Sequence, residues 1–232
     1  MNNKLLILNL GVDSENTSLA FTQKWINDIS INYDAVDVLT MKVGSTYQLN
    51  ENVNLFFIND QNTNYTKIYQ LRKLNKLTRK LIKNNNYTHC FAHMAPMQHL
   101  VAKFYLIQKN IKTTLWFTHS GPKFGIKWLI LWFSSLLANN IVTASKHSFP
   151  LRFKKVKCIG HGINFDNFFI ERKTFQLKNI SILSRVSKSK NIENTIDNII
   201  KCKNFENINI DVIGGTLNID DENYLNELLI KY

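Results

Sequence analysis

The chain has 232 residues, of which 44% are hydrophobic and 12% aromatic, and its formal net charge is +12. A disordered chain is excluded, because such chains have few aromatic and apolar residues. The cysteines Cys90, Cys158 and Cys202 are scattered and form no CxxC pair, which argues against a disulfide framework or a zinc site and fits a reducing cytoplasm. The positive charge predicts a partner or substrate that carries negative charge.

The first two thirds of the sequence alternate between predicted strands and predicted helices. Apolar runs predict strands at residues 5–10, 36–41, 53–58, 90–94, 113–118, 141–144 and 156–159. Helical spacing predicts helices at residues 19–31, 68–83, 97–108 and 124–137, and a polar loop is predicted at 11–18. This alternation is typical of a parallel α/β sheet with helices on both faces. The longest apolar stretch, residues 126–138, is shorter than the about 20 residues of a membrane span.

The pattern changes after Asn164. Residues 165–178 have no period and are predicted to be a linker, after which strands at 180–183 and 208–213 and helices at 191–200 and 224–230 begin a second unit. We therefore expect an N-terminal Rossmann-like domain over residues 1–164 and the start of a second Rossmann-like domain over residues 179–232. A complete doubly wound domain usually has more than about 100 residues, so we expect the second domain to be incomplete in this sequence.

A basic turn at residues 184–191 is the first candidate site. It lies between the strand that ends at Leu183 and the next helix, and in open α/β sheets ligands bind beyond the carboxyl ends of strands. Arg185 offers a two-pronged fork to phosphate and Lys190 a mobile positive charge, so together they are candidates for binding a diphosphate. The alternative is that the lysines of this turn are solvated loop charges.

Three histidines follow predicted strands. His119 and His93 lie at strand ends, where a histidine donates a hydrogen bond or moves a proton, although a lone histidine is more often structural. His161 lies between Gly160 and Gly162, a spacing that predicts a tight turn with exposed backbone. This turn either approaches a ligand or is only a backbone turn, with His161 as an ordinary surface residue.

The helix Lys67–Lys83 is strongly basic. It combines Lys and Arg residues with an apolar stripe and contains no acidic residue. It is expected either to dock on an anionic membrane surface or to pack on the sheet with its charged face in water. No motif for nucleic acid is present, and no nucleic-acid partner is expected.

Several segments together resemble the family 4 retaining glycosyltransferases of the GT-B fold, of the type that assembles bacterial surface polysaccharides. The motifs that carry the resemblance are Trp116-Phe117-Thr118-His119, Ile141-Val142-Thr143-Ala144-Ser145, Ser148-Phe149, Lys155-Val156-Lys157, Ile159-Gly160-His161-Gly162-Ile163-Asn164 and Phe168, with weaker matches at Leu19–Thr22, Trp25-Ile26, Asp37–Thr40 and Ala92-His93-Met94. Each motif is weak alone, whereas their order and spacing are fairly specific.

The resemblance implies transfer of a hexose from a nucleotide-diphosphate sugar to a lipid-linked or polysaccharide acceptor, without a metal or other cofactor. It implies that Arg185 and Lys190 bind the donor diphosphate and that His119 faces the reacting centre. The loop with Gly11, Asp13 and Ser14 is expected near donor and acceptor, together with His93 and Gly162. The expected location is the cytoplasm, as a peripheral protein on the inner face of the membrane.

The sequence departs from the family at several positions. The double glycine after the first strand is replaced by Gly11-Val12-Asp13, and glycines expected beside Arg185 and Lys190 are Ser184 and Asn191. The family's pair of glutamates, seven residues apart, has no counterpart, because Glu222 and Glu227 are too close together. Two alternatives therefore stand beside the transferase: a catalytically inactive truncated remnant, and a basic adaptor that binds membrane or RNA.

Overall fold

The computed structural model describes residues 3–16, 19–46, 49–59, 65–121, 124–162, 179–202 and 208–232. The chain forms two compact units, unit 1 over residues 1–163 and unit 2 over residues 164–232. The linker predicted at 165–178 lies outside the described residues.

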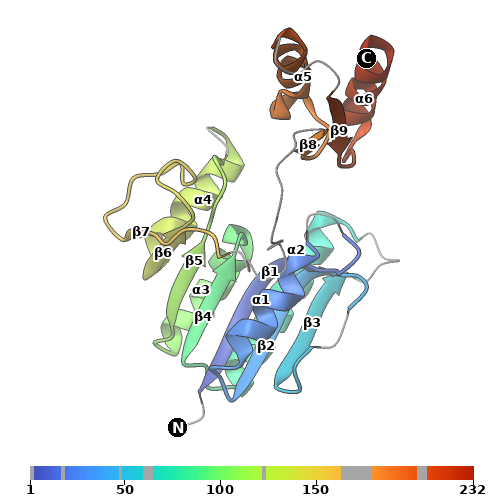
Figure 1. Ribbon diagram of the computed structural model, residues 1–232. Helices are drawn as coiled ribbons and strands as arrows, with labels where there is room; N and C mark the ends of the chain where they lie inside the picture. The colour runs from blue at the N-terminus through green and yellow to red at the C-terminus, as the bar shows by residue number, and fades with distance from the viewer. Residues whose placement is uncertain are drawn as a thin grey trace. The chain divides into compact units, whose positions relative to one another are not determined.

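Unit 1 contains a seven-stranded parallel sheet with the strand order β3-β2-β1-β4-β5-β6-β7 (Figure 1). Its strands are β1 (Lys4–Val12), β2 (Ala35–Val43), β3 (Val53–Asn59), β4 (His89–His93), β5 (Lys112–Trp116), β6 (Asn140–Thr143) and β7 (Val156–Cys158). The chain first winds from β1 toward one edge of the sheet and then returns to β4 on the other side of β1. The direction of winding therefore reverses between β1 and β4, as in Rossmann-like folds.

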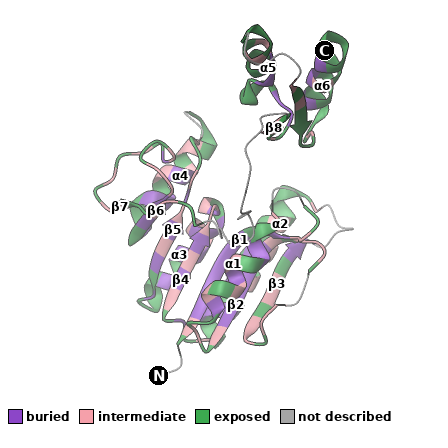
Figure 2. Cartoon of the chain, in the orientation of Figure 1, coloured by how far each residue is buried: buried purple, intermediate pink, exposed green. Residues whose placement is uncertain are grey.

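Helices cover both faces of this sheet. They are α1 (Phe21–Ser30), α2 (Lys67–Asn84), α3 (Pro96–Gln108) and α4 (Ile126–Leu137). Successive side chains of a strand point to opposite faces, so Leu5 and Ile7 pack in one cluster with Ile26 of α1, whereas Leu6 and Leu8 pack in a second cluster with residues of α2, α3 and α4. Because β1 is buried on both faces (Figure 2), its sequence is a continuous apolar run rather than an alternating one.

A buried carboxylate joins the amino ends of four neighbouring strands. Asp37 of β2 is 1% exposed, and the Lys4 ammonium of β1 lies 2.9 Å from its Oδ2. The Tyr87 hydroxyl, just before β4, donates to Oδ2 at 2.5 Å, and the Asn54 amide of β3 donates to Oδ1 at 3.0 Å. Burial, and then the hydrogen bond to Asp37, raises the pKa of Tyr87 above its ordinary value. The charge of Asp37 is thus compensated by partners on both sides of its strand.

Unit 2 is a small two-layer unit. The parallel strands β8 (Asn179–Leu183) and β9 (Asn209–Ile213) pair with each other, and the helices α5 (Ile192–Lys201) and α6 (Ile219–Lys231) pack on them. Val186, Ile192, Ile196, Tyr224 and Leu228 form its core. Each strand is followed by a helix, which is the same βα pattern as in unit 1.

The α/β fold expected from the sequence is confirmed, with corrections at the ends of elements. The predicted loop at 11–18 begins later, since Gly11 and Val12 belong to β1 and pair with β2. The strand predicted at 113–118 ends at Trp116. Helix α6 begins five residues before the predicted start at Tyr224, because the Asn218 side chain accepts a hydrogen bond from the Asp221 amide and caps the helix.

Substituting Gly214 is expected to destabilise unit 2. A Cβ atom at this position would overlap the backbone carbonyl of Ser184, whereas a Cβ at the neighbouring Gly215 meets nothing within 4 Å. We expect Gly214→Ala to lower the free energy of opening of unit 2 by about 1–3 kcal/mol, as an overpacked site does. Native-state hydrogen exchange of β9 and α6 amides measures this change. Gly215→Ala is the matched control, and equal protection in the two variants would contradict the close approach.

Removal of the Asp37 carboxylate is expected to destabilise unit 1. Asp37→Ala leaves the Lys4 charge and the Tyr87 hydroxyl without their shared partner, which typically costs about 3–5 kcal/mol. Asp28 of α1 is exposed and offers a matched control. Asp28→Ala removes one negative charge from the same unit, but it removes no buried carboxylate. Urea unfolding of the two variants tests the difference, and similar losses in both would show that the buried carboxylate is dispensable.

Candidate functional site

The carboxyl edge of the unit 1 sheet at β1 and β4 is the first candidate region. Asn9 of β1 lies in register with His93, the last residue of β4. Beyond these positions the chain leaves β1 toward α1 on one face and leaves β4 toward α3 on the other. In doubly wound sheets the strands diverge here and ligands bind at this point.

His93 lies at this edge among aromatic rings from α1, from β5 and from its own strand. Its ring centroid is 4.7 Å from that of Trp25 in α1 and 6.5 Å from that of Trp116 in β5, to which it is stacked. Phe21 and Phe91 contact it as well. Burial among these rings, with a smaller contribution from the charge of His161, lowers the pKa of His93 to about 4. The imidazole is therefore neutral at physiological pH.

Two buried polar atoms in this cluster have no hydrogen-bond partner among the described residues. They are Nδ1 of His93 and Nε1 of Trp25. Buried polar atoms are nearly always paired, so these two nitrogens are exceptions. Because both nitrogens are buried, they are not accessible to a ligand in this structure, and the cluster offers only its partly exposed aromatic rings.

The loop after β1 is held against the segment after β2. The Ser14 amide and hydroxyl both donate to the Ser45 carbonyl, at 2.8 and 2.9 Å. The Asp13 carboxylate occupies the space that a side chain at Gly44 would need, and it accepts a hydrogen bond from the Glu15 amide at 3.1 Å. Asp13 and Ser14 therefore lie at the carboxyl edge of the sheet. Gly11 is not part of this loop, because it is buried within β1 beside Leu19.

His119 lies three residues beyond β5 and is exposed. Its Nδ1 accepts a hydrogen bond from the Gly121 amide at 3.2 Å, so in the neutral ring the proton resides on Nε2. The exits of β4 and β5 are joined, because the Met94 amide donates to the Trp116 carbonyl at 2.8 Å and the Thr118 amide contacts the Met94 sulfur. His93 and His119 therefore follow two neighbouring, connected strand ends, and His119 offers a donor to a ligand.

The turn after β7 bends at Gly160, the first of the two glycines that flank His161. Gly160 has φ of +79°, a backbone conformation that side chains disfavour, whereas Gly162 has no such constraint and is exposed. His161 between them places its ring edge-on to Trp116, with centroids 5.8 Å apart. His161, rather than Gly162, connects this turn to the aromatic cluster around His93.

Unit 2 carries the second candidate region, at the carboxyl ends of β8 and β9. The Ser184 amide donates to the Ile213 carbonyl and the Val186 amide to the Gly215 carbonyl, which holds the basic turn beside the Gly214-Gly215 turn. Arg185 is exposed, and its Nε lies 3.7 Å from the carboxylate of Asp221. Lys190 is exposed at the end of a short 3-10 helix, Lys188–Lys190. Both predicted diphosphate ligands therefore lie in one solvent-accessible turn.

Asn191 has a left-handed backbone conformation. Its φ is +55°, immediately before the first residue of α5. Asparagine is one of the few residues besides glycine that enter this region readily. Asn191 therefore forms the bend that presents the amino terminus of α5, where an anion is favoured.

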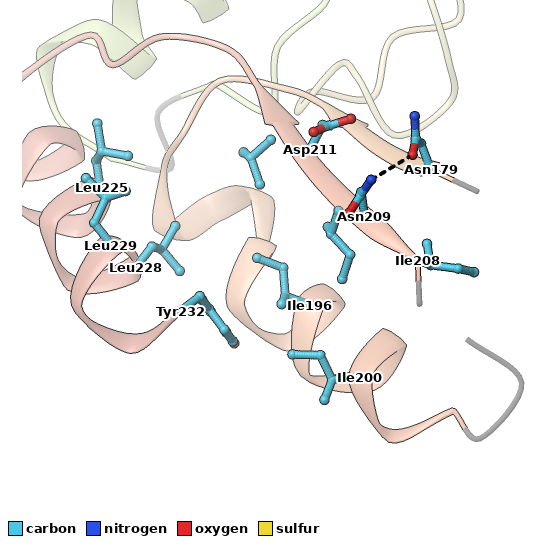
Figure 3. Close-up of a pocket in the computed structure, with 12 residues that line it drawn as sticks. Asn179, Ile196, Ile200, Ile208, Asn209, Asp211, Leu225, Leu228, Leu229 and Tyr232 are labelled. Atoms are coloured by element: carbon cyan, nitrogen blue, oxygen red, sulfur yellow. Dashed lines mark hydrogen bonds between the residues drawn. The ribbon is translucent and has the colours of Figure 1, made fainter. Parts of the chain in front are cut away.

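A further hollow of about 650 Å³ lies along β9, α5 and α6 of unit 2 (Figure 3). Its walls are mainly apolar and include Ile196, Ile200, Leu225, Leu228 and Leu229. Asn179 and Asn209 also line it. They are the first residues of β8 and β9, at the opposite end of these strands from the basic turn. The composition and the position of this hollow do not fit a diphosphate.

The apolar stripe of the basic helix α2 is used inside unit 1. Leu74, Leu81 and Ile82 are buried in the core, and Leu77 packs against it. Arg72, Lys76, Arg79 and Lys80 are exposed. The helix therefore packs on the sheet with its charged face in water, while Ile68 and Leu71 are exposed and docking on a membrane stays a prediction.

The structure thus groups the predicted site residues in two places. Asp13, Ser14, His93 and His119 follow neighbouring strands of unit 1, and Arg185 and Lys190 share a turn in unit 2. Sequence analysis missed Trp25 and Trp116 as neighbours of His93, and Asp221 as the partner of Arg185. The aromatic residues at the ends of β4 and β5 were the available signal.

Comparison with known proteins supports the fold. No protein-family model matches the chain, and no curated protein matches it. HepE from Anabaena in complex with UDP superposes with a TM-score of 0.69 at 15% sequence identity, covering 98% of this chain and 65% of HepE. UDP-GlcNAc 2-epimerase from Methanocaldococcus jannaschii gives a TM-score of 0.57 at 9% identity, covering 98% of this chain and 69% of the epimerase. The chain therefore has a GT-B-like α/β fold and spans about two thirds of the length of these proteins.

The neutrality of His93 predicts acid sensitivity. Its pKa of about 4 in the folded chain lies below the value near 6.5 of an unfolded histidine, so the unfolded state binds more protons between these values. Stability from this residue is complete above pH ~6.5 and is lost as the pH falls toward 4. Urea unfolding at pH 7 and at pH 4.5 measures how much the free energy of unfolding falls between these two pH values. We expect this fall to be smaller in His93→Gln than in wild type, by up to about 2 kcal/mol. His147→Gln, at an exposed histidine, is the control, and an unchanged pH dependence in His93→Gln would contradict a buried neutral ring.

Proposed function

We propose that the chain is the major part of a glycosyltransferase that uses a nucleotide-diphosphate sugar. The observation that carries the proposal is the turn 184–191, where Arg185, Lys190 and the amino terminus of α5 lie together at the carboxyl end of β8. Guanidinium, ammonium and helix amides are the groups that bind phosphates in proteins. HepE, which has a similar fold, has been solved with UDP and glucose and with UDP-glucose, which supports a nucleotide sugar as the substrate.

In the proposed reaction the bond between the anomeric carbon and the diphosphate breaks, and an acceptor hydroxyl oxygen bonds to that carbon. As this bond breaks, one further negative charge develops on the leaving diphosphate, which then accepts the hydroxyl proton. Arg185 and Lys190 stabilise this charge electrostatically, so no metal ion is required. As in family 4 enzymes, we propose that the configuration of the sugar is retained.

Unit 1 is proposed to bind the acceptor. The exposed Nε2 donor of His119 positions the reacting sugar, and the rings around His93 contact the apolar face of an acceptor sugar. Asp13 and Ser14 border this region from the loop after β1. The acceptor class that we propose is a lipid-linked sugar or a polysaccharide, used at the cytoplasmic face of the membrane.

Binding of UDP tests the proposed phosphate site. We expect isothermal titration of the chain with UDP to give measurable heat, and Arg185→Gln and Lys190→Gln each to weaken binding about tenfold or more, the usual loss for one charge-assisted contact. Lys188→Gln is the matched control, because Lys188 lies in the same turn but its ammonium is 3.2 Å from the carboxylate of Glu227 in α6. Uridine, which lacks phosphates, should bind much more weakly than UDP.

The outcomes of this titration separate the alternatives. No heat with millimolar UDP would favour the inactive remnant over the transferase. Equal loss of binding in all three variants would point to general charge attraction rather than to a site. UDP binding followed by release of UDP from UDP-sugars in the presence of a glycan acceptor would support transfer itself.

A further inference from the structure

Apart from Lys127, the exposed side chains of α4 are apolar. Ile126, Leu129, Phe133, Leu136 and Leu137 are each at least 40% exposed. The residues that α4 buries include Ser134 and Ser135, and Ser134 pairs with His99 of α3 at 2.8 Å. This helix therefore reverses the usual arrangement, in which a surface helix turns its polar side to water.

Other exposed apolar side chains extend this surface. Phe124, two residues before α4, is 87% exposed, and Phe104 and Ile107 of the adjoining helix α3 are also exposed. Trp128 and Trp132 of α4 stack on each other with centroids 6.5 Å apart and are partly exposed. Exposed apolar patches of this kind mark interaction sites, and tryptophan is typical of the boundary between lipid and water.

The surroundings of α4 are positively charged. The segment from Gln61 to Phe165 contains 17 Lys and Arg residues and no Asp or Glu, so all 17 acidic residues of the chain lie outside it. Helices α2, α3 and α4 belong to this segment and pack in one cluster on the same face of the sheet. At the carboxyl end of α4, the Lys155 ammonium donates to the carbonyls of Leu136 and Ala138, at 2.7 and 2.5 Å.

These properties select one kind of partner. The outward side chains of α4 offer almost no hydrogen-bonding groups, which a protein or nucleic-acid surface of defined sequence would need for specificity. A layer of anionic phospholipid head groups above acyl chains matches both the apolar face and the positive charge around it. Among the described residues, no helix has the length and hydropathy needed to cross a bilayer, and α4, with 12 residues, is about 18 Å long.

We propose that α4 lies flat in the interface of an anionic phospholipid bilayer, with Leu129, Phe133 and Leu136 among the acyl chains and the acid-free segment facing the head groups. The proposal assigns membrane contact to α4, whereas Leu74, Leu81 and Ile82 of α2 are buried in the core. It does not depend on the proposed phosphate site in unit 2.

Vesicle flotation of the purified chain tests this proposal. We expect the chain to float with vesicles of phosphatidylglycerol and phosphatidylcholine, to bind pure phosphatidylcholine vesicles much less, and to lose binding as salt is raised. The double variant Leu129→Ser with Phe133→Ser should bind at least about tenfold more weakly, because two large side chains no longer enter the lipid. Its thermal unfolding should match wild type, since both side chains are exposed.

A matched double variant controls for loss of exposed apolar surface in general. Ile31 follows α1 on the opposite face of the sheet and Ile219 begins α6, and both are more than 70% exposed. Ile31→Ser with Ile219→Ser should bind vesicles as wild type does. Absence of wild-type binding, equal binding to neutral vesicles, or equal loss in both double variants would overturn the proposal.

Tryptophan quenching locates the contact. Brominated lipids should quench the fluorescence of the bound wild-type chain through Trp128 and Trp132. In Trp128→Phe with Trp132→Phe, which keeps an aromatic ring at each position, binding should persist and the quenching should largely disappear. Full quenching in this variant would place another surface in the lipid and overturn the assignment to α4.

Discussion

The buried carboxylate of Asp37 is the interaction on which the arrangement of unit 1 depends. It bonds to side chains from β1, β3 and the residue before β4, so the amino ends of four parallel strands are held by one charge. In a parallel sheet, fixing the amino ends also sets where the carboxyl ends lie relative to one another. The positions of Asp13, Ser14 and His93 at the opposite edge therefore follow from a polar contact at the far end of the same strands.

The two candidate regions differ in character: the one in unit 2 is cationic, and the one in unit 1 is aromatic and neutral. The cations proposed to bind phosphate lie in a turn of unit 2, whereas the neutral, aromatic surroundings of His93 lie in unit 1. Burial keeps His93 uncharged near neutral pH. The proposed function accordingly assigns the charged donor group to unit 2 and a less charged acceptor to unit 1.

The fold could be predicted from sequence because its signals are local. The apolar run of β1, the regular alternation of strands and helices and the basic turn after β8 each lie within a few residues. The contacts of His93 could not be predicted, because Trp25 and Trp116 approach it only when α1 and β5 are packed on the sheet. Periodicity also failed to show the outward face of α4, because Ser134 and Ser135, which would be expected to face water, are buried. Sequence spacing also does not show which of Gly160 and Gly162 has the left-handed backbone. The geometry of the turn after β7 determines that it is Gly160.

The left-handed backbone at Asn191 limits how this turn can change during evolution. Alanine or a β-branched residue would have to adopt a conformation that costs about 1–2 kcal/mol, whereas glycine or aspartate would fit. Aspartate would, however, place a negative charge close to Lys190, where an anion is expected to bind. Glycine and asparagine both adopt the left-handed backbone and place no negative charge beside Lys190. We therefore expect related chains to have one of these two residues at this position.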